Sequence, residues 1–199
     1  MADNQFVTGP AQRQCGDCSL CCCVFVVPEL NKLAGEWCCH CSSKGCSIYD
    51  SRPAVCANYE CLWLHCPERV PEEFRPDRTG VVINEFAEAD LPIIELHETY
   101  HGAADRICDR VQPARSQGLG ILIYYDGQPH TAIPPILASD ADTTRWLERF
   151  WKRLEERRRI GEAGAQQIQQ QRRAQTHLLH RPTIRSDGTT PANDGQWKA

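Results

Sequence analysis

Short runs of apolar, often β-branched residues in the second half of the chain predict strands. They cover residues 80–83, 91–94, 120–125 and 131–133, and are rich in Val, Ile and Tyr. Asp126-Gly127 separates the last two runs, and Asp-Gly is a preferred pair for a two-residue hairpin turn. The pattern therefore predicts a tight turn between those two strands.

Residues 103–116 have the period of a helix instead. Ala104, Ile107, Cys108 and Val111 follow the spacing i, i+3, i+4, i+7, and Gly118 comes after them as a stop signal. The order of elements is then β-β-α-β-β. We expect an α+β fold: an irregular, metal-stabilised cysteine-rich module, this small β-β-α-β-β region, and an amphipathic C-terminal helix.

That last helix is predicted over residues 143–160. Its apolar residues share one face, opposite a face of Arg and Lys, so it is expected to pack on the α+β core. The apolar face is formed by Trp146, Leu147, Phe150, Trp151 and Leu154. Beyond it, residues 161–199 are predicted to be a polar, largely disordered tail.

Composition indicates a globular protein without a membrane segment. Of the 199 residues 41% are hydrophobic and 24% charged, and no run approaches the ~20 apolar residues that a bilayer requires. The first 14 residues lack an export signal, so we expect a cytoplasmic protein. The net charge of -4, and the glutamates around Arg157, Arg158 and Arg159, argue against nucleic acid as a partner.

Cysteine is the unusual residue, because all but one of the 13 lie between Cys15 and Cys66. Such density indicates either a disulfide scaffold or thiolate metal binding, and the odd number and missing export signal favour the metal. We therefore divide the chain into a flexible N-terminus (1–14), a metal-binding module (15–66), an α+β region with its helix (67–160) and the tail (161–199).

The module opens with two successive C-x2-C steps, Cys15 to Cys18 and Cys18 to Cys21. Two intervening residues let a tight turn bring both sulfurs to one ion. Further cysteines follow in separate segments, which closing a site around an ion requires. Pro53 is well placed to begin a helix, on which Val55, Tyr59 and Leu62 would share a face and cover the site.

The chain resembles the YkgJ-like cysteine-cluster family, a group of zinc- or iron-chelating domains. The resemblance covers residues 13–64 and rests on C-x2-C-x2-C-C, G-C-x-I-Y, R-P-x2-C and E-C-L-W, and residues 75–82 are similar to the segment after the cluster in bacterial members. It implies metal binding but no reaction. It also implies that the ligands are Cys15, Cys18, Cys21, Cys22, Cys38, Cys41, Cys46, Cys56 and Cys61, with Cys23, Cys39, Cys66 and Cys108 as extras.

Nine thiolates exceed the four of one tetrahedral site, and eight would fill two. We favour zinc, as one or two ions, and leave iron or an iron–sulfur cluster open, since sulfur suits both. The bacterial ferredoxin run begins with the same C-x2-C-x2-C, but its x3-C-P continuation is missing, which leaves an iron–sulfur redox protein as the alternative function. His40 and His65 are expected to lie near the ligands or at the surface.

A competing motif lies further on, where His97, Glu98 and His101 match H-E-x-x-H. On a helix this motif places two histidines on one zinc and the glutamate beside its bound water, which would make the protein a zinc hydrolase. A strand-like run leads directly into it, however, and Gly102 follows. We therefore predict a strand-to-helix junction, with the helix beginning near Ala103 and Glu98 without a catalytic role.

Overall fold

The computed structural model describes residues 13–88 and 91–179, and it begins with the cysteine-rich part of the chain. Here the elements are only two to four residues long, and turns connect them. They are α1 (Cys21–Val24), η1 (Pro28–Leu30), β1 (Cys41–Ser42), β2 (Gly45–Cys46), η2 (Tyr49–Ser51), α2 (Ala54–Ala57) and α3 (Leu62–His65). The helix predicted from Pro53 is wrong in length, because α2 and α3 are separated at residues 58–61 and Cys61 lies in extended backbone before α3.

The following region has the α+β architecture and the β-β-α-β-β order that the sequence predicts. Two short helical turns precede the sheet, and three fill its crossover. The elements are η3 (Glu72–Phe74), α4 (Pro76–Thr79), β3 (Val81–Glu88), β4 (Leu91–Glu98), η4 (Ala104–Arg106), α5 (Cys108–Val111), α6 (Pro113–Ser116), β5 (Gly120–Tyr125) and β6 (Gln128–Ile133).

The sheet has the strand order β3-β4-β5-β6, in which only β4 and β5 are parallel. Parallel neighbours need a crossover, and residues 99–119 supply it as three short helices rather than the single helix predicted over 103–116. Pro113 explains one break, since it has no N–H to donate and therefore begins α6. The predicted turn is confirmed: Asp126 and Gly127 both have positive φ, as a type I′ turn requires.

Each face of the sheet is buried against a different partner. Ile83, Leu96 and Ile121 lie on one face, in a core that includes Trp63 of α3 and Ile107 before α5. The other face carries Ile93 and Leu122, which pack with three residues of the C-terminal helix α7 (Asp140–Leu179), namely Trp146, Phe150 and Leu154. This confirms the prediction that the apolar side of that helix covers the sheet. Trp151 was wrongly placed on that side, because it is 54% exposed.

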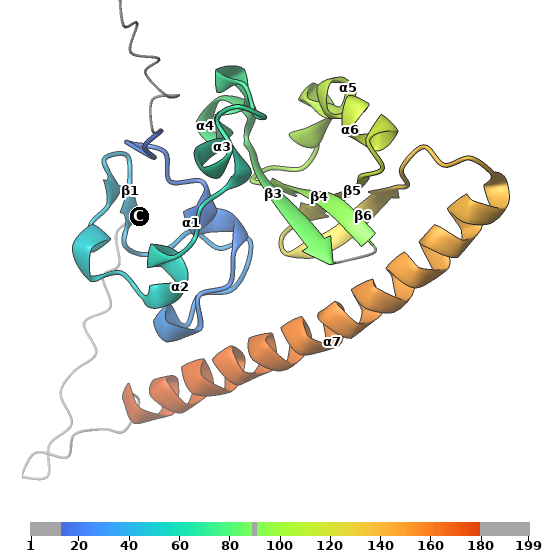
Figure 1. Ribbon diagram of the computed structural model, residues 1–199. Helices are drawn as coiled ribbons and strands as arrows, with labels where there is room; N and C mark the ends of the chain where they lie inside the picture. Colours follow the sequence, from blue (N-terminus) through green and yellow to red (C-terminus); the bar gives the residue numbers. More distant parts are fainter. Residues whose placement is uncertain (1–12, 89–90, 180–199) are drawn as a thin grey trace, which may run out of the picture.

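The helix α7 runs much further than predicted, beneath the sheet and then beneath the cysteine-rich part (Figure 1). It continues to Leu179, so the tail predicted from residue 161 is wrong for residues 161–179, and residues 180–199 lie outside the described residues. Ion pairs between residues of the same helix, such as Arg158 with Glu155 and Glu162, stabilise this polar part of α7. At its far end Ile168 is buried, and Arg172 contacts Glu36 and the Asn31 carbonyl.

The N-terminal boundary is described only in part, because residues 1–12 lie outside the described range. Arg13, which we expected in a flexible segment, is held in place. Its guanidinium donates to the carbonyls of Trp63 and Val70, both at 2.7 Å, and lies over the Trp63 ring. The ordered cysteine-rich part therefore begins at or before this residue.

Candidate metal centre

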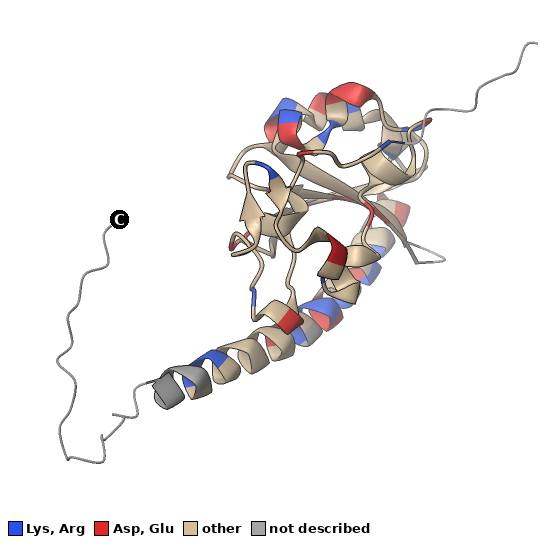
Figure 2. Cartoon of the chain, turned by 90° about the vertical axis from the view of Figure 1, so that its left-hand side faces the viewer, with Lys and Arg blue, Asp and Glu red and all other residues tan. Residues whose placement is uncertain are grey.

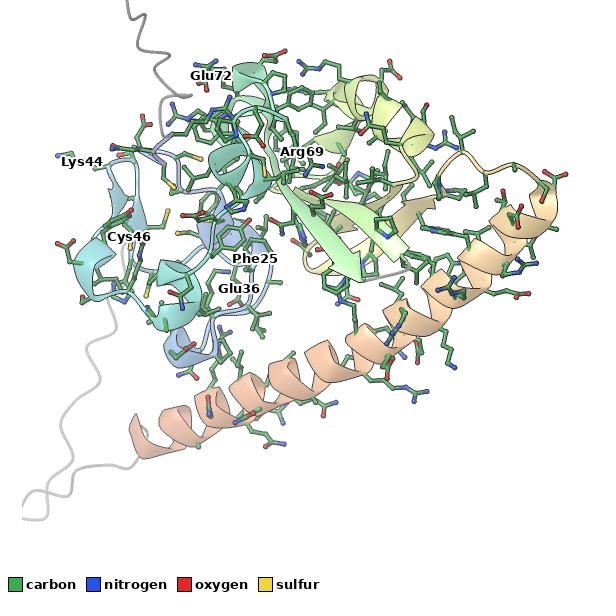
Figure 3. All side chains as sticks on the ribbon, viewed as in Figure 1. Phe25, Glu36, Lys44, Cys46, Arg69 and Glu72 are labelled. Carbon is green, nitrogen blue, oxygen red and sulfur yellow. The ribbon has the colours of Figure 1, made fainter. Side chains whose placement is uncertain are left out.

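A cavity of about 430 Å³ lies inside the cysteine-rich part, and cysteines are its most frequent lining residue. Seven of the nine predicted ligands line it, and their sulfurs gather around this hollow near Cys46 (Figure 3). The seven are Cys15, Cys18, Cys21, Cys22, Cys38, Cys46 and Cys56. The structure thus brings together thiols that lie up to 41 residues apart in the sequence.

The first C-x2-C step forms the tight turn that its spacing predicts. The Cys18 N–H donates to the Cys15 carbonyl at 3.0 Å, and Gly16 between them has a φ of +57°, which glycine adopts most easily. Arg75 holds the turn from outside by donating to the Cys15 carbonyl and the Asp17 carboxylate. Burial raises the pKa of the Cys15 and Cys18 thiols, and the charges of Arg52 and Arg75 oppose that rise at Cys15.

The helix α1 follows at once and separates its three cysteines. Neighbouring side chains on a helix diverge, so Cys21 and Cys22 line the cavity while Cys23 is buried elsewhere, with its sulfur 3.5 Å from the Gly35 carbonyl oxygen. The Cys22 thiol lies between other thiols: its pKa is raised first by Cys21 and then by burial, and Cys41 partly opposes the rise.

A second C-x2-C turn and a two-residue hairpin supply the next thiols. The Cys41 N–H donates to the Cys38 carbonyl at 2.9 Å, and Cys41 is the cross-strand partner of Cys46. The Cys38 N–H donates to the Cys22 carbonyl, which joins this hairpin to α1. Cys41 does not line the cavity, although both of its thiol neighbours, Cys22 and Cys46, do.

Cys56 lies on α2 and Cys61 directly precedes α3, and the two thiols have different neighbours. Burial raises the pKa of Cys56, and negative charge on Cys22, Cys38 and Cys46 adds to the rise. Burial also raises the pKa of Cys61, which Cys15 and Cys18 reinforce. The backbone N–H groups of Leu64 and Trp63, at the start of α3, oppose the rise at Cys61 by favouring a thiolate.

The nine thiols can be divided by the neighbours whose charges act on them. The charges of Cys15 and Cys18 act on Cys61, and those of Cys61, Cys21 and Cys15 act on Tyr59. We call these four the first group. The charges of Cys22, Cys38 and Cys46 act on Cys56, and Cys41 is a neighbour of Cys22 and Cys46, so we call Cys22, Cys38, Cys41, Cys46 and Cys56 the second group. The two groups adjoin where Cys21 contacts Cys22.

The donor set suits a thiophilic ion. All 13 cysteines lie in the described ranges and are free thiols, and no imidazole or carboxylate is among the residues that line the cavity. Sulfur-only donors are typical of zinc and iron–sulfur centres. Within residues 13–88 and 91–179 no three His, Cys, Asp or Glu side chains converge as a ready-made ion site, so binding would require the thiols to turn towards a common point.

The cysteines and histidines outside the implied ligand set do not line the cavity. Cys39 is exposed, Cys66 is half-buried after α3, and Cys108 lies on α5 beside the sheet. His65 is exposed and lies 3.1 Å from Glu60, as expected of a surface histidine.

The H-E-x-x-H segment is not a helix. Its first two residues end β4, as the strand-like pattern predicts, and His101 lies in the following turn. His97 stacks on Tyr124 with ring centroids 4.6 Å apart, whereas His101 lies beside His130, at 5.6 Å. Glu98 is buried and accepts the Ala104 N–H at 2.7 Å. Glu98 therefore caps the turn before η4, and the two histidines do not share a helical face.

Two buried polar groups were not identified from the sequence. Glu95 lies between the sheet and α7, and although burial would raise its pKa, His97 and Arg157 hold the pKa below its usual value. Lys32 lines the thiol cavity and is 4% exposed. No sequence motif marks either residue, because the neighbours that bury it are brought close only by the fold.

Comparisons with protein-family models, with curated proteins and with solved structures each found no match for this chain. Among the described helices, none is both long and apolar enough to cross a membrane.

Proposed function

We propose that this protein binds zinc or iron through the cysteine thiolates, as its resemblance to the YkgJ-like family implies, and we assign no reaction to this site. One observation carries the proposal: seven of the nine implied ligands line a single cavity, and none of its lining residues is a histidine, aspartate or glutamate. Ordinary buried cysteines would be distributed among apolar cores, as Cys23 is.

The lack of an apolar core around the cavity supports a structural role for the ion. Between residues 28 and 60 only Lys32 and Gly45 are buried, while Trp37 and Tyr49 are more than half exposed. A structural metal contributes about 10–16 kcal/mol in small domains of this kind. Metal binding is thus the interaction best able to hold this part of the chain in one conformation.

The two groups of thiols support one or two ions. Four thiolates complete a tetrahedral site, and the first group has four members and the second has five. We propose zinc as the preferred ion, because a tetrahedral thiolate site suits it without a redox partner. An iron–sulfur centre with an electron-transfer role is the second candidate, and the same free thiols support it.

The direct test is metal analysis with an optical spectrum of protein purified without oxygen. A colourless protein with one or two zinc ions per chain is the expected result. A brown protein that bleaches with dithionite would show that the centre is an iron–sulfur cluster and not zinc. A folded protein that contains no metal and takes up neither ion would contradict the proposal.

Matched variants test which thiols bind the metal. Cys61→Ser in the first group and Cys46→Ser in the second should each reduce the metal content, and with two ions each should remove one. Cys23→Ala, Cys39→Ala and Cys108→Ala serve as controls and should keep the full content. Loss of metal in any control would overturn the ligand assignment.

A further inference from the structure

Lys32 is a buried lysine in the wall of the thiol cavity. It follows η1, pairs through its backbone with Val27, and lines the cavity together with Cys22 and Cys38. It is 4% exposed, whereas the other charged residues between 15 and 66 are half-buried or exposed. A buried lysine needs a physical reason, because transferring an ammonium out of water is unfavourable.

The hydrogen bonds of Lys32 do not provide a counter-charge. Its Nζ donates to three backbone carbonyls, those of Cys23 at 3.1 Å, Leu33 at 2.9 Å and Phe25. Carbonyl oxygens satisfy the three N–H groups but carry no net charge. Of the two acidic residues nearest to it along the chain, Glu29 is exposed and Glu36 is held by the Arg172 guanidinium at 2.6 Å. The remaining source of negative charge at this cavity is its thiols.

We propose that the Lys32 ammonium is a buried counter-charge of the thiolate centre, in addition to the half-buried Arg52 of the same cavity wall, and makes the cavity favour the more anionic of two metal states. This inference rests on the proposed function. Four thiolates around a divalent ion leave a net charge of about −2, and around a trivalent ion about −1. Since Coulomb attraction scales with charge, Lys32 stabilises the divalent state about twice as strongly.

The choice of variants separates this electrostatic role from a purely structural one. Lys32→Gln removes the charge but keeps an amide with two N–H groups for two of the three carbonyls, whereas Lys32→Met removes the charge and all donors. Lys32→Arg keeps the charge. Lys44→Gln is the matched control, because Lys44 is exposed on the β1–β2 turn of the same module (Figure 3).

The experiment measures two quantities on the full chain. Zinc affinity, from competition with a chromogenic chelator, should weaken at least tenfold in Lys32→Gln and Lys32→Met, and much less in Lys32→Arg. The second is the midpoint potential of iron-substituted protein, in which dithionite supplies one electron to convert Fe(III) to Fe(II). A tenfold loss of Fe(II) affinity relative to Fe(III) lowers this potential by about 59 mV.

The results distinguish a failure of the proposed metal binding from a failure of the counter-charge role. If wild-type protein binds neither metal, the proposed function fails. If wild type binds both and Lys32→Gln matches it in zinc affinity and potential, the counter-charge role is overturned. If Lys32→Met fails to fold, Lys32→Gln still decides, because a structural role predicts that the amide preserves both quantities and a counter-charge role predicts that both change.

Discussion

The cysteine-rich module and the sheet region are organised on different physical grounds. The strands β3 and β4 have eight residues each, and Val81, Leu96, Ile107 and Ile121 of this region are 0% exposed. The module has elements of two to four residues around a cavity lined by thiols. The sheet region therefore has the apolar burial that ordinarily stabilises a domain, and the two ends of the module share it through Val24 and Trp63. Residues 28–60 have almost no such burial and depend on another interaction.

The helix α7 joins the two regions by different contacts. Its first half buries Trp146, Phe150 and Leu154 against the sheet, whereas its second half reaches the module through Arg172, which contacts Glu36 and Asn31. Basic and acidic residues are interspersed along this helix (Figure 2). The sheet thus holds this helix mainly by apolar packing, and the module holds it largely by polar contacts.

Replacing Cys15 and Cys18 together by serine should give the largest difference between the regions. Loss of a structural metal removes an interaction worth about 10–16 kcal/mol in comparable domains, so metal content and the stability of the module should fall together. Metal analysis and thermal unfolding check this. Cys39→Ser/Cys108→Ser is the matched control. A metal-depleted Cys15→Ser/Cys18→Ser protein with unchanged stability would contradict a structural role.

A substitution in the core of the sheet should lower the stability of the sheet region and leave metal binding unchanged. Leu96→Ala leaves a cavity at a residue that is 0% exposed, and such changes cost about 2–5 kcal/mol. Denaturant unfolding should show this loss, while metal per folded chain stays at the wild-type value. Ile136→Ala is the control, since Ile136 is 60% exposed, and should change stability little. Metal loss in folded Leu96→Ala would show that the regions are not independent.

The contact between α7 and the module should give a small acid-dependent effect. Arg172 hydrogen-bonds Glu36 and lowers the pKa of that carboxyl to about 2, from an ordinary 4.5. The contact therefore stabilises above pH 4.5 and is lost as pH falls towards 2. Both side chains are partly exposed, so the effect is under about 1 kcal/mol.

The measurement is the difference in unfolding free energy between wild type and Arg172→Gln at several pH values. That difference should shrink between pH 5 and pH 2. Arg173→Gln, the exposed neighbour, should show no such trend. A difference that is constant with pH would show that Arg172 does not stabilise the protein through Glu36.

The smallest expected effect concerns the H-E-x-x-H segment. Glu98→Gln should leave metal content unchanged, because His97 and His101 lie on separate sides of a strand end and Glu98 caps the turn at Ala104. Cys56→Ser, analysed in parallel, should reduce it. Stoichiometric loss of zinc from Glu98→Gln would restore the zinc hydrolase hypothesis.

Sequence patterns predicted the elements whose causes are local. Apolar runs located β3 to β6, Asp126-Gly127 located their turn, and the C-x2-C spacing located the turn at Cys15. The length of α7 was not predictable, because Arg172 is fixed by groups 136 and 141 residues away. For the same reason no pattern placed Lys32 beside Cys22 and Cys38, or Cys61 beside Cys15.

Amide hydrogen exchange with and without a metal chelator tests the central claim most directly, because it reads both regions in one sample. On chelation, amides of residues 38–56 should lose protection by several orders of magnitude, and those of β3 to β6 should keep theirs. The Cys41 N–H, bonded to the Cys38 carbonyl, is the most informative single probe. Equal protection of residues 38–56 with and without chelator, in protein shown to lose its metal, would contradict the account.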